Sequence, residues 1–120
     1  MPQYVDGFVI PIPKKNVAKY LKMAKACAKI WIELGAIEYR ECLGDELETK
    51  GMPPFSAAVA FKKNETVLFS WIVYKSKAQR NKVNAKIMKD PRIAAMCKEG
   101  EMPFDIKRMA YGGFTTLVKA

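Results

Sequence analysis

A strand–helix–strand pattern occurs twice in the 120-residue chain, and this order constrains the fold more than any other feature. In the first copy, residues 3–12 and 36–44 alternate as strands on either side of a helical segment at 14–34. At 100° per residue, the apolar positions of this segment share one side and its lysines occupy the other. Gly35 supplies the stop expected just beyond a helix end.

The second copy begins at residues 66–74, TVLFSWIVY, whose β-branched and aromatic composition predicts a central strand. Ser76 followed by Gln79 is a capping-box pattern, which predicts a helix to about residue 89. The Asp90-Pro91 pair is typical of the start of a further short helix. Residues 107–118 are predicted to return as the last strand.

An insert separates the two copies. Residues 45–56 are predicted to form a loop, and residues 57–62, AAVAFK, a short strand. Two βαβ copies with one helix each match the ferredoxin-like α+β arrangement, in which both helices cover one face of an antiparallel sheet. We therefore expect residues 1–120 to form a single domain of this class.

The other face of the predicted sheet would carry apolar side chains without cover. Three residues of the first strand are expected to share this face with three of the 66–74 strand: Tyr4, Phe8, Ile10, Phe69, Trp71 and Val73. A soluble monomer rarely exposes so large an apolar patch. The sequence therefore predicts a two-fold homodimer, with the sheets of the two copies packed face to face about 10 Å apart.

Cysteine, histidine and hydropathy exclude several classes of protein. The three cysteines, Cys27, Cys42 and Cys97, have no CxxC spacing and fit reduced thiols. The absence of histidine excludes His-based triads and His metal sites, so we expect no metal and no cofactor. No apolar run reaches the ~18 residues of a membrane span, and the N-terminus does not resemble a signal peptide. These features favour a cytoplasmic protein.

The net charge of +9 comes from the two predicted helices. Residues 14–34 hold six lysines and residues 75–98 hold eight bases, which together are 14 of the 21 in the chain. The aromatic residues fall on the apolar faces instead of beside these bases, so the sequence does not favour specific nucleic-acid binding. A basic surface that meets acidic macromolecules stays open as an alternative function.

Four stretches carry a resemblance to a known family: YVDGFVIPIPKKN, ETVLFSWIVYKSKAQRN, KIMKDPR and GEMPFDIKRMAYGGF. They resemble the YbaA-like bacterial family, a domain of unknown function, over nearly the whole chain except the insert near 45–56. The resemblance implies a dimeric α/β barrel of ferredoxin-like protomers, and it implies no established activity. The wider superfamily includes cofactor-free monooxygenases, haem-handling enzymes, lactone isomerases and stress-response proteins, but fold does not decide among them.

The stretch EMPFDIKRMAYGGF is the first candidate for a pocket rim. In the functional interpretation, Glu101, Phe104 and Asp105 form a lip over the barrel mouth, and Arg108 is directed at an anionic ligand. In the structural interpretation, Phe104 is an apolar plug, Asp105 is a turn or cap residue, and Arg108 forms a surface ion pair. The Gly112-Gly113 pair is interpreted as a bulge or a close backbone approach.

The remaining candidates lie on the predicted strands. Asp6 alternates with apolar residues and would need a partner if buried, for which Arg40, Glu41 and Arg108 are the candidates. It is either a base or ligand anchor, or half of a buried ion pair. Arg40 shares a strand face with Cys42 while Glu41 faces away, and Trp71 lies on the face opposite Ser70.

The candidate pocket therefore comprises Asp6, Arg40, Glu41, Trp71, Glu101, Phe104, Asp105 and Arg108. We expect it to hold a small acidic or aromatic metabolite, with cofactor-free chemistry such as proton abstraction as one hypothesis. A binding or regulatory module without chemistry is the alternative that the same residues allow.

Overall fold

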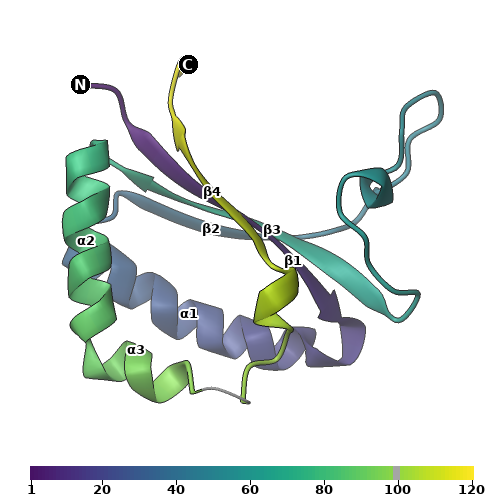
Figure 1. Cartoon of the computed structure of the whole chain (residues 1–120), viewed down its shortest axis with the longest axis horizontal. Helices are drawn as coiled ribbons and strands as arrows, with labels where there is room; N and C mark the ends of the chain where they lie inside the picture. The colour runs from purple at the N-terminus through teal and green to yellow at the C-terminus, as the bar shows by residue number, and fades with distance from the viewer. Residues whose placement is uncertain (99–100) are drawn as a thin grey trace.

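A computed structural model describes residues 1–98 and 101–120. Its four strands form one antiparallel sheet in the order β2-β3-β1-β4, with the helices on one side and the other side open (Figure 1). The strands are β1 (Tyr4–Pro13), β2 (Glu38–Leu43), β3 (Glu65–Tyr74) and β4 (Ala110–Thr115). The helices are α1 (Val17–Leu34), α2 (Lys77–Lys89) and α3 (Pro91–Met96). This order of elements is the predicted ferredoxin-like arrangement. None of the described helices is both long and apolar enough to cross a membrane.

The predicted end of the first helix and the starts of the other two are confirmed, because local side chains determine them. The helix predicted from residue 14 begins only at Val17, after the 3-10 helix η1 (Lys14–Asn16). Gly35 adopts a φ of 127° at the end of α1 and donates its N–H to the Ile32 carbonyl. The Ser76 hydroxyl accepts the N–H of Gln79 at 3.1 Å, which caps α2. Asp90 accepts the N–H of Arg92 at 2.8 Å and starts α3.

The predicted strand at 57–62 is wrong. Residues Phe55–Ala57 form a short 3-10 helix instead, and no strand follows until Glu65. The run is rich in alanine, which is depleted in strands, and Pro53-Pro54 immediately precede the helix. The last strand is shorter than predicted at both ends: the 3-10 helix η3 (Ile106–Arg108) precedes it, and it ends at Thr115, opposite the first residue of β1.

The predicted membership of the open sheet face is wrong for β1. In the β1–β3 pairing, Tyr4 lies opposite Tyr74, Phe8 opposite Ser70 and Ile10 opposite Leu68, so these residues face the helices. Phe69, Trp71 and Val73 point to the other, open face. The alternation of β1 could not show which of its faces meets the helices, because the face that carries Val5 and Val9 is apolar as well.

The core between sheet and helices is divided into two clusters. One gathers around the C-terminal half of α1 with α2 and α3, and includes Cys27, Tyr74 and Val83. The other joins Ile10, Ile12 and Leu68 of the sheet to Tyr20 and Ala24 in the N-terminal half of α1. The candidate functional site lies where these two clusters meet.

Candidate functional site

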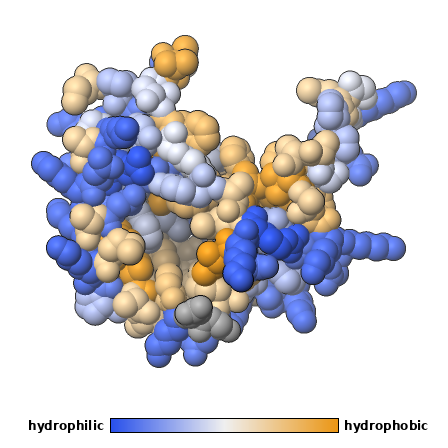
Figure 2. Space-filling view, viewed as in Figure 1, coloured by the Kyte–Doolittle hydropathy of each residue, from blue (hydrophilic) through white to orange (hydrophobic). Residues whose placement is uncertain are grey.

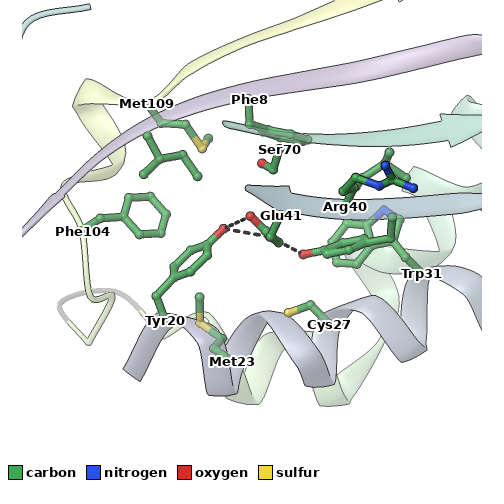
Figure 3. Close-up of a pocket in the computed structure, with 13 residues that line it drawn as sticks. Phe8, Tyr20, Met23, Cys27, Trp31, Arg40, Glu41, Ser70, Phe104 and Met109 are labelled. Atoms are coloured by element: carbon green, nitrogen blue, oxygen red, sulfur yellow. Dashed lines mark hydrogen bonds between the residues drawn. The ribbon is translucent and has the colours of Figure 1, made fainter. Parts of the chain in front are cut away.

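A cavity of about 150 Å³ lies between the sheet and α1 (Figure 3). It is lined by side chains from both core clusters, and ten of the 13 lining residues are apolar or aromatic. The lining residues are Phe8, Ile10, Tyr20, Met23, Cys27, Trp31, Tyr39, Arg40, Glu41, Ser70, Ile72, Phe104 and Met109. Helix α1 supplies one wall and strands β1, β2 and β3 supply the other, and Phe104 and Met109 of the segment before β4 close one end.

Glu41 is the polar centre of this cavity. The Tyr20 hydroxyl lies 2.9 Å from both carboxylate oxygens, and the Tyr39 hydroxyl donates to Oε2 at 2.8 Å, as the dashed lines in Figure 3 mark. Burial raises the pKa of the Glu41 carboxyl, while hydrogen bonds from Tyr39, Tyr20 and Ser70 act in the opposite direction. A carboxyl group held by phenols in a mostly apolar cavity is suited to accept a proton as the carboxylate and to donate one as the acid.

Strand geometry explains why these groups meet. Tyr39 and Glu41 are two residues apart on β2 and therefore share the face that looks toward α1. Ser70 is paired directly opposite Glu41 on β3. Tyr20 comes from the second turn of α1 and is buried against the same face. Burial raises the pKa of both tyrosines, so they remain hydrogen-bond donors at neutral pH.

Arg40 contributes no free charge to the cavity. Although it lines the cavity edge, its guanidinium pairs with Glu38 at 3.2 Å and lies 5.6 Å from the centre of the Trp71 ring on the open face. The other residues that line the cavity include no lysine and no second arginine in the part of the chain that the structure describes. An anionic ligand would therefore meet Glu41 without a compensating cation.

Arg108 is not directed at a ligand. It binds Glu65 through two short hydrogen bonds, of 2.7 and 2.9 Å, and donates to the Ala60 carbonyl. Glu65 is buried, and the guanidinium lowers the pKa of its carboxyl to about 2. This is the ion pair of the structural interpretation, and it ties η3 to the start of β3.

The other residues of the predicted lip lie in different places and do not form one rim. Phe104 lies on the cavity wall and packs edge-on against Tyr20, with ring centres 5.7 Å apart. Asp105 caps η3 by accepting the N–H of Lys107. Glu101 lines a different groove, on the outer side of Met23, and Trp71 is on the open face of the sheet.

Asp6 is buried on the helix side of the sheet, and Arg80 of α2 is its partner. The Arg80 Nη1 atom lies 3.6 Å from Asp6 Oδ1. The expected neighbours Arg40, Glu41 and Arg108 are engaged elsewhere, so the sequence did not identify the partner. Among the described residues, no three His, Cys, Asp or Glu side chains gather as metal ligands would.

Comparison with known proteins decides the family. A family model described as "Protein of unknown function (DUF1428)" matches residues 3–106. The chain belongs to this family. It is 43% identical over 116 residues, 97% of each chain, to the uncharacterized protein YbaA of Escherichia coli K12, and equally to that of Shigella flexneri. The YbaA-like resemblance is thereby confirmed.

The fold of this family member is also found among solved structures. The crystal structure of a dimeric ferredoxin-like protein from an uncultured marine organism superposes with a TM-score of 0.61 over 100% of both chains. Sequence identity is only 9%, so this likeness concerns the fold alone. The ferredoxin-like α+β class predicted from the sequence is confirmed.

Three residues of the site were missed by sequence reasoning. Tyr20 has the spacing of a core residue in α1, and Tyr39 is one of several apolar positions in β2. Arg80 was one of many bases on a predicted helix. The packing of α1 brings Tyr20 to Glu41, and no local motif signals it, whereas the two-residue spacing of Tyr39 and Glu41 on one strand could have indicated that these two share a face.

Proposed function

We propose that the Glu41 cavity binds an uncharged, ring-sized group that carries one hydroxyl or carbonyl. The observation that carries this proposal is a buried carboxylate, held by two phenols, inside an otherwise apolar cavity. A cavity near 150 Å³ with aliphatic and aromatic walls is of the size that accommodates benzene. A ligand hydroxyl would donate to the Glu41 carboxylate, a ligand carbonyl would accept from a tyrosine hydroxyl beside it, and the ring would contact the apolar wall.

The charges around the cavity favour a neutral ligand over an acidic one. The sequence left acidic and aromatic metabolites as equal options. Arg108 is paired with Glu65 and Arg40 with Glu38, so neither cation is free to bind a carboxylate. Bringing an anion beside Glu41 would place two like charges in a poorly solvated site.

The same geometry supports proton abstraction without a cofactor. For a bound ketone, the Glu41 carboxylate would take a proton from the carbon next to the carbonyl, and the C–H electron pair would move onto the carbonyl oxygen as an enolate. As Glu41 gains the proton, the hydroxyl of Tyr20 or Tyr39 would turn from the carboxyl group and donate its one O–H to that oxygen. Return of the proton to carbon completes the cycle, so no oxidant or reductant is consumed.

Binding is tested by calorimetric titration of phenol and benzoate. We expect phenol to bind at least tenfold more tightly than benzoate. Glu41→Gln should weaken phenol about tenfold, because a hydrogen bond to a charged group is replaced by a neutral one. Glu33→Gln, an exposed glutamate on α1, is the matched control and should leave the affinity unchanged. Equal binding of benzoate, or equal effects of the two substitutions, would refute the proposal.

Chemistry is tested separately by NMR of cyclohexanone in D₂O. Exchange of the protons next to the carbonyl should be faster with the wild-type protein than with Glu41→Gln. Binding of cyclohexanone without accelerated exchange would leave the non-catalytic binding module as the function.

We also infer that the chain forms a homodimer through the open sheet face. Phe69 and Phe114 are 50% and 60% exposed there, beside Trp71. A solved protein of the same fold is described as dimeric, which supports the inference. Phe69→Lys should shift the mass in sedimentation to that of a monomer, whereas Ile32→Lys, at a comparably exposed position on α1, should not. A wild-type protein that sediments as a monomer would overturn the inference of a homodimer.

A further inference from the structure

A groove adjoins the Glu41 cavity on the same side of the sheet. Its volume is about 460 Å³, and it runs between α2 and β4. The groove and the cavity share four wall residues, Phe8, Trp31, Ile72 and Met109, and are therefore side by side. Figure 2 shows this side hollowed between α2 and η3, with hydrophobic surface in the hollow and hydrophilic side chains around it.

Asp6 is the acid that lines this groove. Only 2% of its surface is exposed, yet Oδ1 has no hydrogen-bond partner among the residues that the structure describes. Arg80 Nη1, at 3.6 Å, is near enough for charge attraction and too far for a hydrogen bond. Buried carboxylate oxygens are almost always hydrogen-bonded, so this atom is suited to receive a donor from a ligand.

Arg80 is held away from that oxygen by two tyrosines. Its guanidinium lies 4.8 Å from the centre of the Tyr4 ring and donates to the Tyr4 and Tyr111 hydroxyls at 3.3 and 3.0 Å. Gly113 makes room for this arrangement, because a Cβ there would lie 2.4 Å from the Tyr4 hydroxyl oxygen. The glycine pair in AYGGF is thus explained by a close approach at Gly113, which keeps Arg80 in place.

The two buried acids line adjoining hollows, Glu41 the cavity and Asp6 the groove, and the four shared side chains lie between them. Asp6 is paired with Ile72, which is paired with Tyr39, two residues from Glu41 on β2. At the usual strand spacing and rise, the two Cα atoms are roughly 12 Å apart. The side chains and their hydrogen bonds span part of this distance, and a two-ring molecule spans the rest.

We propose that Asp6 and Arg80 form a second polar subsite, which accepts a hydroxyl at the far end of an elongated two-ring ligand. The ligand hydroxyl donates to Asp6 Oδ1, while the ring at its other end lies in the Glu41 cavity. This deepens the proposed function and rests on it, and it assigns the ligand to neutral two-ring compounds with a hydroxyl at each end.

The test compares three probes by calorimetry: phenol, 2-naphthol and 2,6-dihydroxynaphthalene. The wild-type protein should bind the diol at least tenfold more tightly than 2-naphthol, because the second hydroxyl gains a hydrogen bond to a buried carboxylate. In Asp6→Asn this ratio should fall to about one, while phenol binding stays unchanged. Unchanged phenol binding also reports that the variant is folded.

The outcomes separate the two proposals. If phenol binds and the diol has no advantage over 2-naphthol, the subsite is wrong and the Glu41 cavity stands. If the advantage survives in Asp6→Asn, the subsite is also wrong. If phenol itself does not bind the wild-type protein, both proposals fail together.

A second pair of variants covers the case in which Asp6→Asn does not fold. Gly113→Ala displaces Tyr4 and frees Arg80 to close on Asp6, so the diol should lose its advantage. Gly112→Ala meets only the movable Phe114 ring, at 3.3 Å, and should keep that advantage. Equal ratios in the two alanine variants would overturn the subsite.

Discussion

Removing the Arg108 guanidinium should destabilise the fold without weakening ligand binding. The pKa of Glu65 falls from its usual 4.5 to about 2, mainly through Arg108 and to a smaller extent through Lys62. Each pKa unit corresponds to about 1.4 kcal/mol, so the whole shift amounts to about 3.5 kcal/mol, of which Arg108 supplies the larger share. The Arg108 side chain is 29% exposed, so solvent screens part of this interaction. We therefore expect Arg108→Gln to lower the free energy of unfolding by about 2 kcal/mol, or roughly 8 °C in Tm.

The pH dependence of that loss identifies its cause. The pKa of Glu65 is lower in the folded than in the unfolded protein, so the stabilisation is fully present above pH 4.5. It is lost as the pH falls through about 2. In urea denaturation, the gap between wild type and Arg108→Gln should be constant from pH 7 to 5 and should narrow below 4.5.

Arg92→Gln is the matched control for this experiment. Arg92 also binds two acids, but half of its side chain is exposed. Its replacement should therefore lower the free energy of unfolding by much less than the replacement of Arg108 does. If Arg108→Gln left stability unchanged and instead reduced phenol binding, the assignment of Arg108 to a structural ion pair would be refuted.

Three further predictions concern other parts of the chain. Burial raises the pKa of Glu41 in the folded protein, so its ionisation opposes folding as the pH rises above 4.5. In urea denaturation at pH 8, Glu41→Gln should therefore be more stable than wild type, and this difference in the free energy of unfolding should shrink toward pH 4.5. A difference that grows toward acid would contradict the prediction. Burial raises the pKa of the Cys27 thiol to about 11, whereas Cys97 is exposed. When the protein is treated with an alkylating reagent, mass spectrometry should therefore find Cys97 modified before Cys27, and added phenol should slow the modification of Cys27 further. Equal rates at the two cysteines would count against the burial of Cys27. Ser76→Ala removes the cap on the Gln79 N–H and should cost about 1 kcal/mol in thermal unfolding, and no change in Tm would mean that this cap contributes nothing.

The sequence predicted the helices well because their signals are local. Caps at Ser76 and Asp90 and the stop at Gly35 each depend on residues within one turn. The register of β1 was different, because both of its faces are apolar and a shift by one residue exchanges them. Its two faces are distinguished only by pairing with β3, which lies far along the chain.

The candidate site was predicted only in part, for the same reason. Glu41 and Phe104 lie on the cavity wall, but the donors that hold Glu41 come from α1 and from a neighbouring position on β2. Arg80 reaches Asp6 across the end of the sheet from α2. The contacts of Tyr20 and Arg80 depend on how the helices cross the sheet, which the spacing of residues within each element does not encode.

The cavity at Glu41 has a consequence for how the molecule responds to compression. A volume of 150 Å³ per molecule is about 90 mL/mol. The pocket is partly open, so only the part of this space that water does not fill adds to the volume decrease on unfolding. Unfolding eliminates such internal space, so hydrostatic pressure should favour the unfolded chain more strongly than in a tightly packed relative. A molecule bound beside Glu41 would occupy that space and would leave the protein harder to unfold by pressure.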